Sequence, residues 1–155
     1  MLRKIESFFT SMMGDEAPTE GLSENEIAIA SAALLVKCAN ADGKRTPEED
    51  AKLVEVITKG LELSAEEAES VIEFAEVRAR DALDIHQFTK RLHANLDREE
   101  RQRMVGWLWE MAQVDGRIDS DEQNTVTLIA RLLDVEVRDS AELRQNAKRS
   151  FKTKG

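Results

Sequence analysis

The chain has 155 residues, a net charge of −9, 41% hydrophobic residues and 34% charged residues. This length supports one domain with its own core, and the balance of residues excludes a chain that is disordered throughout. One cysteine, Cys38, rules out a disulfide framework within a single copy. No apolar run approaches the ~20 residues that a membrane span needs, so we expect a cytoplasmic protein without a transmembrane segment.

Residues 1–13 are the first predicted element, an amphipathic segment that a linker over 14–22 joins to the rest of the chain. Its apolar residues recur at helical spacing: Leu2, Ile5, Phe8, Phe9 and Met12. Only Arg3 and Lys4 are present to attract anionic lipid. We therefore expect the segment to dock on its own bundle, or on a second copy of the chain in a homodimer, rather than on a membrane.

Helix-start signals then recur along residues 23–150, the predicted helical domain. In each, a capping residue stands three positions before Glu or Gln, so that the first side chain accepts from a backbone N–H and the second reaches back. The pairs are Ser23–Glu26, Thr46–Glu49, Ser64–Glu67, Asp84–Gln87, Asp97–Glu100, Asp119–Glu122 and Asp139–Glu142. They predict seven helices, over 24–41, 47–60, 65–80, 85–95, 98–114, 120–134 and 140–150, and leave a basic tail over 151–155.

Two of these helices, over 27–39 and 104–114, are apolar on nearly all sides, as expected for helices at the centre of a bundle. They also begin an internal repeat. With an offset of 73, KCANADGK aligns with EMAQVDGR, and Glu49 falls on Glu122. A one-residue slip then keeps Ile57, Leu61 and Leu63 on Ile129, Leu133 and Val135. The sequence therefore predicts an all-α, single-domain bundle of about seven helices, built from two helix–Asp-Gly turn–helix units.

Lys37 and Glu110 occupy equivalent positions inside the two apolar helices. A buried charge needs a partner, so we expect these two side chains to be buried and to meet across the repeat axis. Trp107 and Trp109 are two residues apart and cannot share one helix face. We expect one of them in the core and the other at a contact surface.

The second Asp-Gly turn resembles half of a calcium-binding loop. Asp115 to Glu122 carries the Asp, the turn Gly and the later Glu of an EF-hand. The first half fails, because the early ligand positions fall on Met111 and Gln113 within a predicted helix, and calcium needs about six to eight oxygens. A helix that ends at a left-handed glycine, followed by a new helix start, explains the same residues without a metal ion.

The second occurrence of Asp before Gly supports a site hypothesis as well. In a pseudo-twofold bundle, the four acids of the turns lie at matching ends of the central helices: Asp42, Glu49, Asp115 and Glu122. Further acids follow on the next turns: Glu48, Asp119 and Asp121. Whether the two ends converge depends on whether the central helices run parallel or crossed. Converging acids would hold a divalent cation such as calcium, magnesium or manganese weakly, or would dock a basic segment of a partner protein.

Several stretches are similar to a known family. They are ADGKRTPEE, VDGRIDSDE, LWEMAQVDGR and ALDIHQFTKRLHANLDREERQRMV. Over about 22–146 the chain resembles the TerB-like family, bacterial helical proteins named for tellurite resistance, and its short amphipathic N-terminus resembles a small stand-alone proteobacterial branch. The resemblance implies an all-α fold of roughly seven helices, no enzymatic activity, and acidic positions for metal ions or partners that match Asp42, Glu49, Asp115 and Glu122. Arg45 departs from the family pattern, in which a branched apolar residue such as Ile118 is usual.

Other chemistry finds little support. His86 and His93 lack the spacing of a helical zinc pair, and a thiol in an apolar helix is usually inert. Residues 144–155 carry five basic residues and no acid, so the remainder carries a net charge of −14 and repels nucleic acid. We expect a non-enzymatic adaptor that binds a partner protein through its acidic turns. The alternatives are a weak divalent-cation-binding protein of a metal or tellurite stress response, and a metal-dependent hydrolase.

Overall fold

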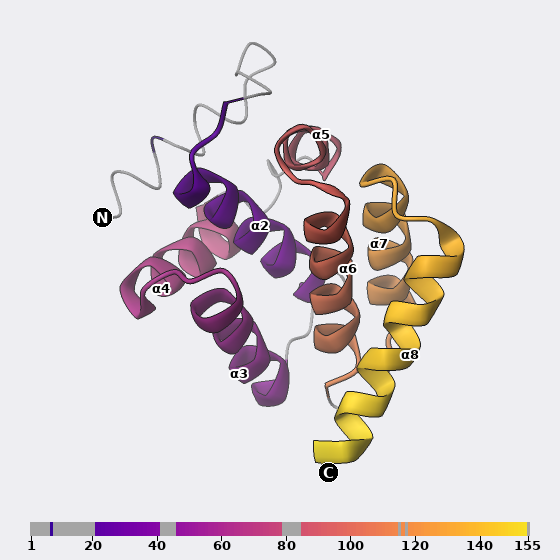
Figure 1. Ribbon diagram of the computed structural model, residues 1–155. Coiled ribbons are helices and arrows are strands. Elements are labelled where there is room, and N and C mark those ends of the chain that lie inside the picture. The colour runs from indigo at the N-terminus through magenta and orange to yellow at the C-terminus, as the bar shows by residue number, and fades with distance from the viewer. Residues whose placement is uncertain are drawn as a thin grey trace.

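A computed structural model describes Ser7 and residues 21–40, 46–78, 85–114, 116 and 118–154, apart from the side chains of residues 77, 78 and 148–154. In this part of the chain, seven α-helices follow one another: α2 (Glu24–Ala39), α3 (Pro47–Glu55), α4 (Ala65–Glu73), α5 (Ile85–Asn95), α6 (Arg98–Ala112), α7 (Ser120–Leu132) and α8 (Val137–Lys154). Two π-helical segments, η1 (Val56–Gly60) and η2 (Phe74–Arg78), extend α3 and α4. No strand occurs among the described residues, and the all-α prediction is confirmed (Figure 1).

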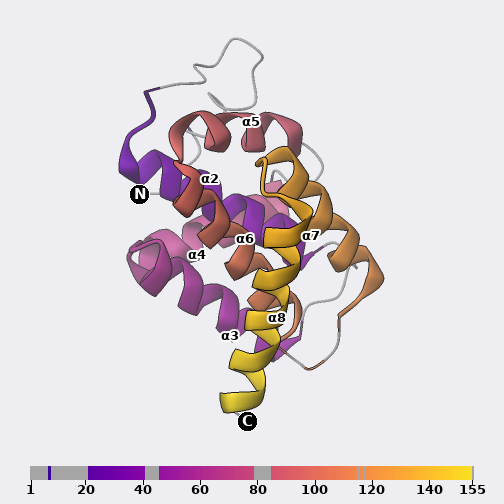
Figure 2. The same cartoon turned by 45° about the vertical axis from the view of Figure 1, so that its right-hand side comes forward.

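Helix α2 forms the centre of the bundle. It contacts α3, α4, η2, α5, α6 and α7, and most of its residues are buried. Many of them are alanines, whose small side chains let the neighbouring helices approach closely. Helix α6 lies against α2 on one side and against α8 on the other (Figures 1 and 2). The prediction of an all-round apolar centre therefore holds better for α2, where Ile27 and Lys37 are the half-buried residues of 27–39, than for α6, which also keeps Trp107 and Glu110 half-buried.

Most of the predicted helix starts are confirmed. Complete capping boxes begin α2, α3, α4 and α6, with Ser23, Thr46, Ser64 and Asp97 as the N-caps. Pro47 stands at the start of α3, where its missing N–H breaks no helical hydrogen bond. The predicted pair Asp84–Gln87 lies partly outside the described residues.

Two predicted starts differ from the structure: α7 begins at Ser120 with Asp119 as its N-cap, as predicted, but without the predicted capping box, and α8 begins earlier than predicted. Asp119 accepts from the N–H of Asp121 at 2.8 Å, so no capping box with Glu122 forms. Helix α8 begins at Val137 rather than at residue 140, because Asp139 contacts α6 instead of capping. Its Oδ2 accepts from Gln102 Nε2 at 3.4 Å and lies 3.6 Å from Arg98 Nη2. At its other end α8 continues to Lys154, beyond the predicted helix end at residue 150.

The helix ends repeat in pairs. Helices α2 and α6 end at Ala39 and Ala112, two residues earlier than predicted, and the next residues, Asn40 and Gln113, have nearly the same backbone angles. Glu62 and Asp134 both have positive φ, 59° and 57°, where the chain turns after η1 and after α7. The first pair, Asn40 and Gln113, matches the predicted repeat alignment before its one-residue slip, and the second pair, Glu62 and Asp134, matches it after the slip. The tandem repeat itself stays a prediction.

Candidate functional site at the acidic turns

The beginning of α3 places the first acid of the site. Thr46 Oγ1 accepts from the N–H of Glu49 at 3.1 Å, and Glu49 Oε1 accepts from the Thr46 N–H at 3.4 Å. The Thr46 hydroxyl also donates to Glu49 Oε1 at 3.3 Å. This double contact folds the Glu49 side chain back onto the turn, where it is only 4% exposed.

The beginning of α7 places the second acid differently. Asp119 caps the helix through the N–H of Asp121, in place of the predicted capping box with Glu122. Its side chain is nevertheless only 3% exposed. Ile118, the residue directly before the Asp119 cap, is partly buried and packs against the hydrophobic core. Glu49 and Glu122, at positions that the predicted repeat would make equivalent, are therefore both buried although their helices are capped differently.

Burial sets Glu49 apart from the other glutamates that close capping boxes. Glu26 and Glu67 are half-buried and Glu100 is exposed, although all three make the same two hydrogen bonds with their caps. Capping chemistry alone does not require a buried carboxylate, and burying one costs free energy unless it is well satisfied. The positions of Glu49 and Glu122 thus have a property that helix capping does not explain.

Exposed acids surround the buried pair. Glu48, Asp119 and Asp121 lie on the first turns of α3 and α7, and all three are exposed. Acids are favoured there, because the helix N-terminus carries a partial positive charge. In both views the beginnings of α3 and α7 lie toward the end of the molecule where α6 ends (Figures 1 and 2).

Half of the predicted four-acid set is described. Asp42 and Asp115 lie outside the described residues, so the prediction that all four acids converge stays untested. Within the described part of the chain, no three His, Cys, Asp or Glu side chains are grouped so as to hold a metal ion. The described residues contribute Glu49 and Glu122, whose carboxylate oxygens are the ligand type that hard divalent cations prefer.

The comparisons with known proteins agree with this architecture. The family model described as Tellurite resistance protein TerB matches residues 28–145. The chain belongs to the TerB family. No curated protein and no solved structure gives a significant match. The match spans α2 to α8 and both acidic turns, so the site lies within the family's own domain.

One prediction about this TerB-family chain needs correction. Lys37 and Glu110 are half-buried, not buried. Each lies near the end of its helix, where fewer neighbours cover a long side chain whose charged head can reach water. Contact between the two side chains stays a prediction.

The remaining titratable candidates have ordinary surroundings. His93 Nε2 lies 2.7 Å from Asp134 Oδ2, His86 is exposed, and Cys38 is buried and forms no disulfide. None of the described helices is both long enough and apolar enough to cross a membrane.

Sequence reasoning missed a cleft beside α7 and α8. Trp109 is buried and Trp107 half-buried, as expected for one core and one more exposed tryptophan. Trp109, however, also forms part of the wall of this cleft. No local sequence pattern predicts the cleft, because its lining comes from three helices that meet only in the folded chain.

Proposed function

We propose that this TerB-family protein is a non-enzymatic cytoplasmic adaptor whose acidic turns bind a basic segment of a partner protein. The observation that carries the proposal is the set of exposed acids on the first turns of α3 and α7: Glu48, Asp119 and Asp121. A single exposed ion pair contributes at most about 1 kcal/mol, so binding needs several acids presented together. The net charge of −9 adds long-range attraction for a basic partner.

Neutralising these acids is expected to weaken partner capture. Full-length protein is immobilised and exposed to the native cytosol, and the bound proteins are compared between wild type and Glu48→Gln/Asp119→Asn/Asp121→Asn. We expect basic partners to be lost from the variant by about tenfold, since each of three lost contacts is worth a few tenths of a kcal/mol or more. The wild-type complex should also weaken as salt rises.

A control variant separates the site from overall charge. Glu66→Gln/Glu69→Gln/Glu73→Gln removes three exposed acids of α4 and changes the net charge equally. It should retain the partners. If both variants lost the partners equally, net charge alone would explain the binding. If both variants retained the partners, the proposal that the acidic turns bind them would be contradicted.

A second candidate function is weak binding of a divalent cation. It is favoured by one observation, the burial of both Glu49 and Glu122, which the predicted repeat would make equivalent. A cation would compensate the cost of holding two carboxylates away from water. Asp42 and Asp115 are the further ligands that the sequence offers. Nothing in the described residues favours the hydrolase alternative.

Titration with calcium, magnesium and manganese tests the cation directly. We expect backbone amide signals around Glu122 to shift at millimolar metal, and Glu49→Gln/Glu122→Gln to raise the Kd at least tenfold, because a carboxylate ligand loses its charge. A cation at ten times its Kd should stabilise the wild type by about 1.4 kcal/mol. The matched control is Glu26→Gln/Glu67→Gln, which alters two capping glutamates that are not buried. If the amide signals around Glu122 did not shift as metal is added, cation binding would be contradicted, and the adaptor proposal would stand without a cation.

A further inference from the structure

An apolar groove runs between α7 and α8, and we call it the α7–α8 groove. Its volume is about 510 Å³, and its lining includes Trp109, Ala130, Val135, Val137 and Ala141. Helices α7 and α8 lie side by side in both views (Figures 1 and 2). Val137, at its edge, is 88% exposed, which is unusual for a large aliphatic side chain.

The wall of the groove is preformed. The Trp109 indole N–H donates to Ser140 Oγ at 3.0 Å, and the Arg144 guanidinium carbon lies 5.0 Å from the centre of the Trp109 ring. Gln113 Nε2 donates to the backbone carbonyl of Arg144 at 3.1 Å, which fixes α8 against the end of α6. The indole N–H is thus satisfied from within the chain, so the groove offers an apolar partner a surface that is already in place.

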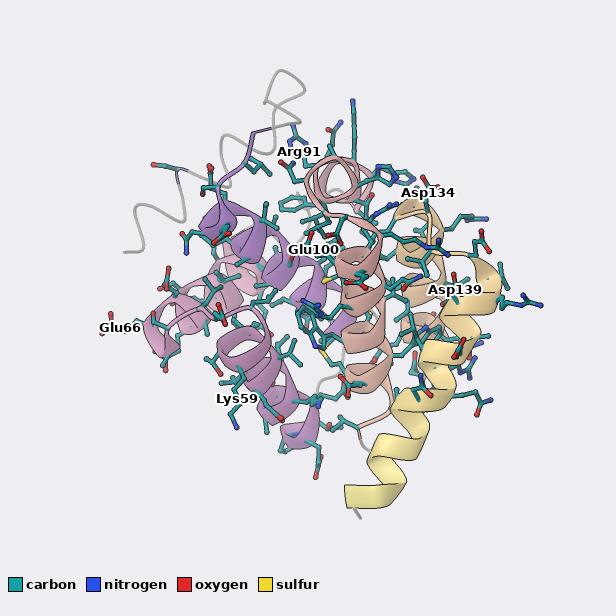
Figure 3. All side chains as sticks on the ribbon, in the orientation of Figure 1. Lys59, Glu66, Arg91, Glu100, Asp134 and Asp139 are labelled. Atoms are coloured by element: carbon teal, nitrogen blue, oxygen red, sulfur yellow. The ribbon has the colours of Figure 1, made fainter. Side chains whose placement is uncertain are left out.

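The described chain enters the domain beside α5, a helix that contacts one edge of this groove. The Leu22 N–H donates to Asn95 Oδ1 at 3.2 Å, at the end of α5. Two residues before Asn95, His93 contacts Asp134 at 2.7 Å, and Asp134 lines the groove. Figure 3 shows Asp134 at the end of α7 that lies beside α5. Leu22 is therefore hydrogen-bonded to a helix that itself contacts the edge of the groove.

The preceding segment has the matching chemistry. Helical spacing predicts that its apolar residues at 2, 5, 8, 9 and 12 share one face, with Ser7 on the opposite face. Ser7 itself is helical and exposed. Eleven helical residues span about 16 Å, and the eight residues 13–20 reach up to about 26 Å when extended. The groove is lined by two acids, Asp134 and Glu136, and by two arginines, Arg131 and Arg144, so the match with the segment is one of apolar surface rather than of net charge.

We infer that residues 2–12 dock, through their apolar face, into the α7–α8 groove of the same chain. A tethered segment has an effective concentration of roughly millimolar, which favours the chain's own segment over a free partner. Docking would remove both Val137 and the apolar side chains of the segment from water, which is favourable. The groove shares no lining residue with the acidic turns, so this inference and the adaptor proposal fail separately.

A spin label tests the docking in the full-length chain. Ser7→Cys places the label opposite the apolar face, and Cys38 is buried and does not compete for it. We expect the label to broaden the Trp109 indole N–H signal and the Val137 methyl signals, while Val54 on α3 stays sharp. Unbroadened Trp109 and Val137 signals would overturn the inference.

Two variants should weaken this broadening. Phe8→Ser/Phe9→Ser and Val137→Glu are each expected to lower the ratio of docked to free segment by at least about tenfold, because a buried aromatic or aliphatic side chain contributes at least that factor. Val54→Glu is the matched control, since Val54 is also a large exposed aliphatic residue, at 43%, and does not line the groove. Unchanged broadening in Val137→Glu would overturn the inference.

Mixing experiments separate the other occupants. In this experiment, chain that carries the spin label but no NMR isotope is mixed with isotope-enriched chain that carries no spin label. Broadening of the Trp109 signal would then assign the docked segment to a second copy and overturn docking within one chain. Sharp signals in the mixture support it. Anionic vesicles are added as a further arm, and loss of broadening at a low vesicle concentration would assign the segment to a lipid surface instead.

Discussion

Replacing Trp109 with alanine is expected to lower the free energy of unfolding by about 3–5 kcal/mol. Trp109 is 3% exposed and lies where α6 meets α7 and α8. Helix α8 packs more extensively against α6 than against α7, so loss of the ring leaves a cavity at the contact that holds α8 in place. Urea unfolding followed by circular dichroism measures the change.

Graded variants separate the ring from its hydrogen bond. Trp109→Phe keeps an aromatic ring and removes the N–H that donates to Ser140, so we expect a smaller loss than for alanine. Ser140→Ala leaves the buried indole N–H without its acceptor and should cost about 1–3 kcal/mol. If Trp109→Ala cost less than Ser140→Ala, the packing role of the ring would be contradicted.

Replacing Leu35 with alanine is expected to lower the free energy of unfolding by about 2–5 kcal/mol. Leu35 is fully buried on α2, the helix that six other elements contact. Helices on all sides restrain one another, so the site collapses poorly around a missing side chain and most of the cavity remains. Thermal and urea unfolding measure the loss.

The control for this change is Leu132→Ala. Leu132 is half-buried near the end of α7, where solvent and mobile surface side chains can fill the space. The same chemical change should therefore cost clearly less there. An equal cost at both positions would argue against α2 as the centre of the core.

The burial of Glu49 and Glu122 marks the limit of local reasoning about the site. The sequence identifies both residues, because each stands three positions after a capping residue. Their low exposure arises only when the first turns of α3 and α7 fold against the rest of the bundle. Local pattern thus locates the acids, whereas tertiary packing distinguishes Glu49 from the more exposed Glu26.

The sequence by itself determined the elements whose signals are local. The starts of α2, α3, α4 and α6 follow from side chains three residues apart, and the central place of α2 follows from its apolar circumference. These signals act within one or two helical turns, so no other part of the chain is needed to interpret them.

Only the tertiary structure decided the features that depend on distant residues. Helix α8 starts at Val137 because Asp139 contacts Gln102 and Arg98 of α6, more than thirty residues earlier in the chain. The α7–α8 groove likewise exists because three helices meet around Trp109. Contacts between residues far apart in sequence leave no periodic trace in either segment, and packing free energy then overrides the local preference of a capping residue.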